Sequence, residues 1–348
     1  MTVFDNETLS SVLKYLGIIF IGTKVLPLLR TLYDVYLVEG LKLKKIGSWE
    51  RSLDQYETLP ILSNLLVITG CTDGIGKEFA LQLAKAKFNI LLISRTQSKL
   101  DELKEIIVRD HGIEAKTLAI DFCKPGTEKY DQIKEAIQDL DVHALINNVG
   151  LSHEHPKSLE EEDDKAVQDI LEINVTSTVL VTKAVIPAMI RATSKSGLSG
   201  LIMTVGSFSG VLPTPYLTTY SASKAFLQTF TQSLGPELEK HKIVVTNIIP
   251  YFVVSKMSKI RKSSFLIPSP QAYVRSVLSK IGVTCGTSLP YNSIPYSGHA
   301  IIGWALETFG TQQFWINFNR DGMLKTRARA LKKKELAEAN ATAESKSQ

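Results

Sequence analysis

Short apolar runs alternate with amphipathic stretches from about residue 61 onward. The runs are continuous and rich in Ile, Val and Leu, which is typical of strands buried on both faces of a parallel sheet. They cover residues 65–69, 89–94, 116–120, 142–147, 201–205 and 243–249. Stretches with a helical period lie between and after them, at 75–87, 97–111, 126–139, 160–193, 217–240 and 268–281. This alternation predicts an α/β fold built on a doubly wound parallel sheet.

The N-terminal segment has a different pattern. Residues 15–38 are apolar over a length that can cross a bilayer, but Lys24, Arg30 and Asp34 interrupt them. A charge near the middle of a membrane helix costs about 2.5–3.5 kcal/mol, and pairing of Arg30 with Asp34 at i,i+4 lowers that cost. The basic segment that follows places the rest of the chain in the cytosol. We expect residues 1–58 to form a membrane-anchor segment and basic linker, with an amphipathic helix docked on the domain as the alternative.

Composition and the number of cysteines limit the kinds of partner and the cellular compartment that we expect. The chain has 348 residues and a net charge of +5, with 44% hydrophobic residues. This mild positive excess comes without an aromatic-studded basic surface, so we expect no nucleic-acid partner. The three cysteines, Cys71, Cys123 and Cys285, are too few and too far apart to predict a disulfide framework or a zinc site. We therefore expect no metal, and a catalytic body that faces a reducing compartment.

A glycine-rich turn, TGCTDGIG, directly follows the first predicted strand and opens the first predicted helix. Glycine permits the tight turn and lets the backbone approach a pyrophosphate, while the helix N-terminus attracts the phosphates. An ordinary strand–helix turn is the alternative, but the context on both sides favours a dinucleotide site. The residues expected to contact the cofactor there are Gly70, Thr72, Asp73, Gly74, Ile75 and Gly76.

Three further positions bear on the cofactor. Arg95 ends the second strand where an acidic residue would hold the ribose hydroxyls of NAD, so it favours NADP(H) unless it is merely solvated. Asp121, after the third strand, is placed to reach the adenine or to cap the next helix. Asn148 lies in NNVG at the end of the fourth strand, where a direct contact and a structural role are both open.

The spacing Tyr-x-x-x-Lys occurs twice, in YDQIK and in YSASK. Tyr130 and Lys134 lie on a helix rich in carboxylates, which predicts a solvated, charged surface. Tyr220 and Lys224 begin the helix after the fifth strand, and Ser207 lies at the end of that strand. Ligands of open parallel sheets bind outside the carboxyl ends of the strands. We therefore expect Ser207, Tyr220 and Lys224 to converge on one carbonyl group.

Taken together, these motifs resemble the short-chain dehydrogenase/reductase family over about residues 62–260. The resemblance rests on TGCTDGIG, NNVG, Asn174 within LEINVTS, Ser207, and Tyr220 with Lys224. It implies that Tyr220 donates a proton to the substrate carbonyl as hydride arrives from NADPH, while Ser207 hydrogen-bonds the same oxygen. It also implies that Asn174 holds a water that relays protons to Lys224. A phenol with a pKa near 10 needs a nearby ammonium to lower it.

The same resemblance implies cofactor contacts after the sixth strand. The segment PYFVVS keeps Val253 and offers the Ser255 hydroxyl, but Tyr251 stands where the family often has glycine. We expect the bulk of Tyr251 to leave less space at the nicotinamide end of the site.

Within that family, the chain is most similar to the membrane-bound very-long-chain 3-oxoacyl-CoA reductases, with the 17β-hydroxysteroid dehydrogenases next. The cues are the apolar N-terminal segment, GSFSG followed by LPTP, and PYFVVSKMSKI. The similarity implies NADPH-dependent reduction of long-chain 3-oxoacyl-CoA to 3-hydroxyacyl-CoA in fatty-acid elongation. It further implies the endoplasmic reticulum membrane, a cytosol-facing catalytic domain, and other elongation enzymes as partners. A steroid or other lipid ketone as substrate and a non-catalytic scaffold are the alternatives.

The expected domain plan follows from these patterns. Residues 59–285 form a Rossmann-type NADP-binding catalytic domain. Residues 286–331 carry aromatic residues followed by basic ones, which fits a membrane-proximal or substrate segment as well as a packed helix. Residues 332–348 are polar and predicted to be disordered.

Overall fold

The computed structural model describes residues 6–47 and 64–346, with side chains to residue 340. Residues 48–63, in the predicted linker and at the predicted domain start, lie outside it. A parallel sheet in the order β3-β2-β1-β4-β5-β6-β7 forms the centre and confirms the doubly wound fold. The strands are β1 (Leu65–Thr69), β2 (Asn89–Ser94), β3 (Ala115–Ala119), β4 (Val142–Asn147), β5 (Gly200–Val205), β6 (Ile243–Ile248) and β7 (Asn292–Ser293).

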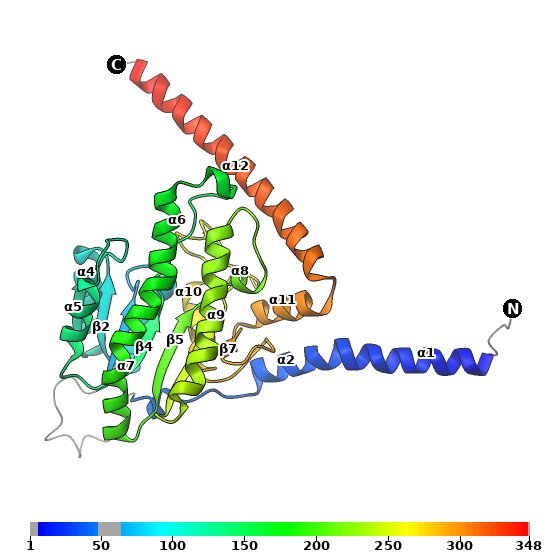
Figure 1. The fold of residues 1–348 in the computed structure, drawn as a ribbon, viewed down its shortest axis with the longest axis horizontal. Helices are drawn as coiled ribbons and strands as arrows, with labels where there is room; N and C mark the ends of the chain where they lie inside the picture. Colours follow the sequence, from blue (N-terminus) through cyan, green and yellow to red (C-terminus); the bar gives the residue numbers. More distant parts are fainter. Residues whose placement is uncertain (1–5, 48–63, 347–348) are drawn as a thin grey trace.

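Helices cover both faces of this sheet, as Figure 1 shows. One face carries α3 (Gly74–Lys85), α4 (Gln97–His111) and α10 (Pro270–Leu278), and the other carries α5 (Glu128–Ile137), α7 (Ser177–Ser196) and α9 (Thr218–Glu239). Strand side chains alternate between the two layers, because successive residues of a strand point to opposite faces. In β1, Leu66 and Ile68 join the first core, and Leu65 and Val67 join the second. Burial on both faces explains why the strands read as continuous apolar runs.

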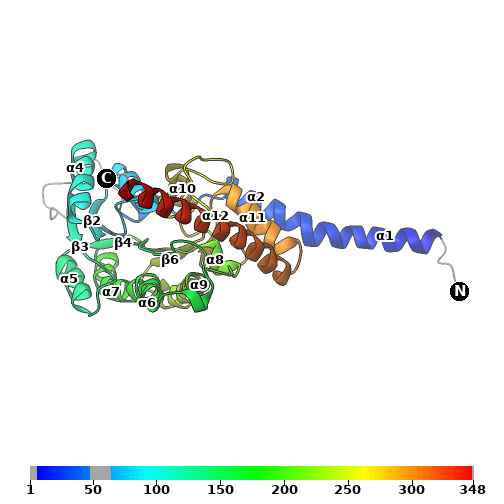
Figure 2. The same cartoon turned by 90° about the horizontal axis from the view of Figure 1, so that it is seen from above.

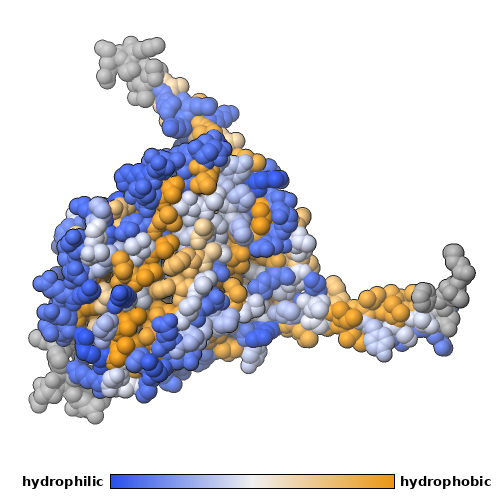
Figure 3. All heavy atoms as spheres, in the orientation of Figure 1, coloured by the Kyte–Doolittle hydropathy of each residue, from blue (hydrophilic) through white to orange (hydrophobic). Residues whose placement is uncertain are grey.

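The N-terminal segment is one continuous helical run, Asn6–Tyr36. It consists of α1 (Asn6–Phe20), a π-helical turn η1 (Ile21–Val25) and α2 (Leu26–Tyr36). The run is long and apolar enough to cross a membrane, and the α1 side chains are exposed. Asp164–Ser196 passes the same test, but half of its most apolar stretch is buried inside the protein. In Figures 2 and 3, α1 extends away from the body with a largely hydrophobic surface, which makes it a candidate membrane anchor.

The candidate anchor is docked on the rest of the protein through α11 (Ser297–Thr308). The Trp304 indole Nε1 donates to the Lys24 carbonyl oxygen at 3.1 Å, and Lys24 Nζ donates to the Thr308 carbonyl oxygen. Val35 of α2 is buried in a small apolar cluster that includes Phe208, which follows Ser207 directly. The candidate anchor is therefore packed against the residues that border the predicted site.

The C-terminal region differs from the prediction in two ways. β7 pairs with β6 beyond residue 285, where the catalytic domain was expected to end, because a two-residue strand leaves no periodic signal. One helix, α12, runs over Gln312–Lys346, so the prediction of disorder after residue 332 is wrong for the described part of the tail. The tail is rich in Lys, Ala and Glu, which are strong helix formers even where they bury no core.

Candidate active site

The glycine turn is packed against the end of β4. Gly70 and Gly74 adopt positive φ angles of 64° and 52°, and the Asp73 carboxylate accepts from the Gly74 amide at 2.8 Å. Asn148 Nδ2 donates to the Gly70 carbonyl oxygen at 2.9 Å. A Cβ on Gly76 would overlap both Asn148 Nδ2 and the Gly70 oxygen. The turn thus presents bare backbone and the N-terminus of α3 at the carboxyl edge of the sheet, which fits a dinucleotide pyrophosphate. Asn148 has a structural role here.

We expect Gly76→Ala to weaken NADPH binding at least tenfold and to lower the melting temperature. The added methyl group cannot fit without moving backbone, and overpacking of this kind costs about 1–3 kcal/mol. Titration of NADPH by fluorescence measures the first effect, and thermal unfolding measures the second. Gly322→Ala in α12 is the matched control, because its Cβ would meet nothing within 4 Å. Unchanged NADPH affinity in Gly76→Ala would contradict the assignment of the turn.

The remaining predicted cofactor residues lie within the turn or shortly after β2 and β3. The Thr72 hydroxyl lies 2.9 Å from that of Ser94 at the end of β2, and the exposed Arg95 follows. Asp121 Oδ1 accepts from the Cys123 amide at 3.1 Å, so it shapes its own loop. Ile75 is partly buried against the first core.

The loop after β6 closes over the turn from the other side. Val253 is buried, and the Ser255 Cβ would lie 3.5 Å from a side chain on Gly74. The Ser255 hydroxyl accepts from the Ser258 amide at 3.1 Å. Tyr251 stays 40% exposed at the rim and packs edge-on against Phe208. The loop after β6 therefore lies beside the glycine turn.

Ser207, Tyr220 and Lys224 come together at the end of β5. Ser207 caps the short helix α8 (Phe208–Val211), and its Oγ accepts from the Ser209 amide at 3.1 Å. Tyr220 lies in the first turn of α9, and its hydroxyl hydrogen-bonds with that of Ser207. Lys224 is one turn further on, with Nζ 5.8 Å from the centroid of the Tyr220 ring. The i,i+4 spacing places both side chains on one face of α9, as the sequence predicts.

The pKa of Tyr220 differs from the expectation that Lys224 lowers it. Burial raises the pKa of the Tyr220 phenol, and the hydrogen bond with Ser207 opposes this rise. Burial also lowers the pKa of Lys224 from 10.5 to about 8. Lys224 Nζ donates to the Val205 carbonyl oxygen at 2.8 Å, and the side chain is 5% exposed. The net effect on the phenol is a raised pKa, so desolvation outweighs the influence of the neighbouring ammonium.

Asn174 lies in a π-helical turn, η5 (Glu172–Thr176), between α6 (Asp164–Leu171) and α7. Its Nδ2 donates to the Leu151 carbonyl oxygen and to Ser223 Oγ, both at 2.9 Å, and its Oδ1 accepts from the Leu151 amide at 2.8 Å. A Cβ on Gly150 would lie 3.5 Å from both Asn174 Oδ1 and Lys224 Nζ. The Asn174 side chain therefore holds the NNVG segment against α9, beside Lys224. Its role in a water relay stays a prediction.

The sequence did not predict a buried polar network that lies beside Tyr220. His153 Nε2 lies 2.7 Å from Glu162 Oε1, and both side chains are almost fully buried. The Thr219 hydroxyl, next to Tyr220, donates to Glu162 Oε2 at 3.1 Å. His153 and Glu162 are nine residues apart, Thr219 lies 57 residues further on, and the three match no motif, so no local signal could have found them. The network ties the loop after β4 to the helix turn that carries Tyr220.

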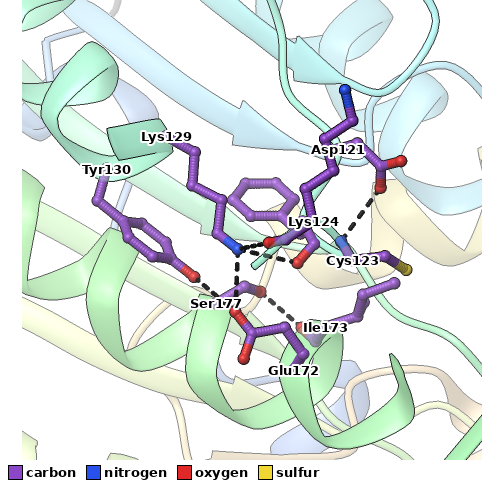
Figure 4. A network of polar contacts seen from close by, with 9 residues as sticks. Asp121, Cys123, Lys124, Lys129, Tyr130, Glu172, Ile173 and Ser177 are labelled. Atoms are coloured by element: carbon purple, nitrogen blue, oxygen red, sulfur yellow. Dashed lines mark hydrogen bonds and ion pairs between the residues drawn. The ribbon is translucent and has the colours of Figure 1, made fainter. Parts of the chain in front are cut away.

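The prediction of a solvated surface around the other Tyr-x-x-x-Lys pair is half wrong. Tyr130 is 4% exposed and belongs to the second core, while Lys134 is exposed and pairs with Asp131. Figure 4 shows the neighbouring Lys129 reaching Glu172, at a distance of 3.0 Å. Lys129 Nζ also donates to the Phe122 carbonyl oxygen at 3.1 Å. The carboxylates along this helix indicate only its solvent-facing side, whereas Tyr130 lies on the core-facing side. Neither residue of this pair lies with Ser207 or Lys224.

Comparison with known proteins agrees with this geometry. The family model described as short chain dehydrogenase matches residues 64–264. The very-long-chain 3-oxoacyl-CoA reductase of Coprinopsis cinerea is 42% identical over 310 residues, 88% of this chain and 86% of that protein. The protein of the same name from Laccaria bicolor is 40% identical over 336 residues, 96% of this chain and 94% of that protein.

Solved structures share the fold at lower identity. A structure from a study of 7β-hydroxysteroid dehydrogenase stereoselectivity has a TM-score of 0.64 at 19% identity, covering 74% of this chain and 97% of that one. A short-chain dehydrogenase from Sphingobium yanoikuyae in complex with NADPH has a TM-score of 0.56 at 22% identity, covering 66% and 87%. The family model matches more than half of this chain. The chain therefore belongs to the short chain dehydrogenase family and is an oxidoreductase that uses a nicotinamide dinucleotide.

Proposed function

We propose that the protein reduces long-chain 3-oxoacyl-CoA to 3-hydroxyacyl-CoA with NADPH, as a step of fatty-acid elongation. The observation that carries this proposal is its identity of 40–42% with very-long-chain 3-oxoacyl-CoA reductases over 85–96% of the chain. Ser207, Tyr220 and Lys224 are all present and adjacent, which argues against a non-catalytic scaffold.

In this reaction the bound NADPH supplies a hydride to the ketone carbon. The turn from Gly70 to Gly76 holds the dinucleotide by its backbone and by the N-terminus of α3. Tyr220 gives its proton to the ketone oxygen, because its raised pKa keeps the phenol protonated at neutral pH. Ser207 donates a hydrogen bond to the same oxygen as negative charge develops there. Lys224 places a positive charge beside the phenol and favours the phenolate that remains.

The preference for NADPH over NADH rests on Arg95. Its exposed guanidinium lies at the end of β2, where a 2′-phosphate can be bound by two N–H groups. We expect Arg95→Asp to lower the ratio of kcat/KM for NADPH to that for NADH by about 10²-fold, since it replaces attraction with repulsion. Arg109→Asp, at an exposed arginine of α4, should leave the ratio unchanged. A constant ratio in Arg95→Asp would remove Arg95 from the cofactor site.

An apolar substrate is supported by the packing around Ser207. Phe208 joins the cluster that holds Val35 of the candidate anchor. His299 of α11 accepts from the Tyr251 amide at 3.3 Å and lies 3.2 Å from the Phe252 carbonyl oxygen, so it ties the rim of the site to the same helix. A long acyl chain is poorly soluble, and an enzyme anchored in the bilayer receives it there. We place the protein at the endoplasmic reticulum membrane with its catalytic body in the cytosol, beside the other elongation enzymes.

The substrate is tested by NADPH oxidation in the purified protein with 3-oxo-octadecanoyl-CoA against the steroid oestrone. We expect kcat/KM to be at least 10²-fold higher for the thioester. A preference for the steroid would replace the acyl-CoA assignment with the 17β-hydroxysteroid alternative. Turnover of neither compound would overturn lipid-ketone reduction.

A further inference from the structure

Tyr220 lies between two hydroxyl side chains that tie the first turn of α9 to different parts of the protein. On one side, the Thr219 hydroxyl donates to Glu162 Oε2, in the loop after β4, at 3.1 Å. On the other, the Ser221 hydroxyl donates to the Ser209 carbonyl oxygen of α8 at 2.5 Å. Successive residues of an α-helix point about 100° apart, so the two hydroxyls leave the helix on either side of the Tyr220 phenol.

Glu162 is a buried carboxylate with a partner on each oxygen. Its side chain is 1% exposed, and that of His153 is 3% exposed. His153 Nε2 lies 2.7 Å from Glu162 Oε1, while Oε2 accepts from Thr219. The other ring nitrogen of His153, Nδ1, is buried and has no hydrogen-bond partner among the residues that the structure describes. The contact with Glu162 therefore orients the imidazole ring, and the ring in turn offsets the cost of burying the carboxylate.

The start of α9 depends on contacts of this kind from outside the helix. Leu217, at the N-cap position, makes no side-chain capping bond. Tyr216, just before it, adopts a φ of 66°, in the left-handed region that bulky residues seldom occupy. The Lys157 amide, again from the loop after β4, donates to the Tyr216 carbonyl oxygen at 2.9 Å. A carboxylate beside the first turn of a helix also interacts favourably with the helix dipole, so Glu162 stabilises an end that lacks a side-chain cap.

We propose that Glu162 is a positioning residue that fixes the direction of the Tyr220 phenol through Thr219. His153 supports it by binding the other carboxylate oxygen. The inference rests on the proposed role of Tyr220 as proton donor, and it adds residues that act through α9 rather than on the substrate. Rotation of the first turn of α9 about its axis moves the phenol hydroxyl away from Ser207, with which it hydrogen-bonds. Proton transfer requires the two heavy atoms to lie within about 2.6–3.2 Å, so a small displacement slows the reaction.

Thr219→Val tests the proposal, because valine has nearly the shape of threonine and lacks the hydroxyl. We expect kcat for reduction of a 3-oxoacyl-CoA to fall about tenfold as the phenol is displaced. KM for NADPH should stay within about twofold of wild type, since the substitution does not touch the glycine turn. Thr219→Ser keeps a hydroxyl at the same place and should recover most of the lost kcat. Thr218→Val, at the exposed threonine of the same helix turn, is the control and should keep the wild-type kcat.

A double-mutant cycle separates positioning of the phenol from a general loss of stability. In a Tyr220→Phe background there is no phenol hydroxyl to place, so adding Thr219→Val should lower kcat by less than about twofold. Glu162→Met, which removes both acceptor oxygens at similar length, should give the same pattern and serves if Thr219→Val does not fold.

The remaining outcomes distinguish this inference from the proposed function. If Thr219→Val lowers kcat by the same factor in both backgrounds, or leaves it unchanged in the wild-type background, the positioning role is wrong and the proposed function stands. If Tyr220→Phe alone leaves kcat unchanged, the proton-donor assignment fails and the inference fails with it.

Discussion

Tyr220→Phe should lower kcat for ketone reduction by about 10²–10⁴-fold while leaving KM for NADPH close to its wild-type value. The substitution removes the hydroxyl that hydrogen-bonds with Ser207 and keeps the ring that packs beside Lys224. Without a proton donor, the alkoxide that forms on hydride transfer has only Ser207 to stabilise it. NADPH oxidation under saturating 3-oxoacyl-CoA measures the loss.

Tyr130→Phe is the matched control, because Tyr130 has a lysine at the same spacing. Its hydroxyl makes one long contact, 3.5 Å to Glu172, inside the second core. We expect its kcat to stay within about twofold of wild type, as for a mutation that touches no reacting group. If Tyr220→Phe kept more than a tenth of the wild-type kcat, the proton donor would have to be another group.

Lys224→Met should lower kcat by about 10²-fold or more and at the same time make the protein more stable at pH 7. Burial lowers the pKa of Lys224 from 10.5 to about 8, so keeping the ammonium in the folded state costs roughly 3 kcal/mol. Methionine has a similar length and no charge. We expect a gain of about 1–2 kcal/mol, since the lost hydrogen bond to the Val205 oxygen offsets part of the effect.

The cost of the buried Lys224 ammonium to the stability of the wild-type protein depends on pH. Below about pH 8, Lys224 is charged in both folded and unfolded chains, and the full cost of burial is present. Between pH 8 and 10.5 the folded protein releases the proton while the unfolded chain keeps it, so the cost disappears and wild-type stability rises. Thermal unfolding of wild type and Lys224→Met at pH 7 and pH 10 should therefore differ at the lower pH and converge at the higher one. Lys134→Met, at an exposed lysine, serves as control, and an equal difference at both pH values would contradict the buried-charge assignment.

Much of the site was predictable because the family's motifs are local. The turn from Gly70 to Gly76 follows a strand and opens a helix, and Gly70 and Gly74 adopt positive φ angles, which favour glycine for reasons local to the turn. Tyr220 and Lys224 share a helix face through their spacing alone. Placing Ser207 beside them needed one more rule, that the carboxyl ends of parallel strands meet at one edge.

The electrostatic state of the site was not predictable, because burial is a property of the folded chain. The sequence suggests a lysine that lowers the pKa of a tyrosine, but the structure surrounds both groups with protein and gives Lys224 a backbone partner. The same limit applies to Tyr130, whose carboxylate-rich neighbours concealed a core position. It also applies to His153 and Glu162, which meet through loop geometry.

By itself, the sequence determined the alternation of strands and helices along the chain, the glycine-rich turn, the candidate catalytic residues and the apolar N-terminal run. These features depend on residues close together in the chain, or on the hydrophobic period within one helix or strand. The tertiary structure alone decided that α12 is a helix laid over the loops after β4 and β5, that α2 is docked beside Phe208, and that His153 meets Glu162 beside Tyr220. Such contacts join residues far apart in the chain, and they exist only where the packing of the whole domain brings those residues together.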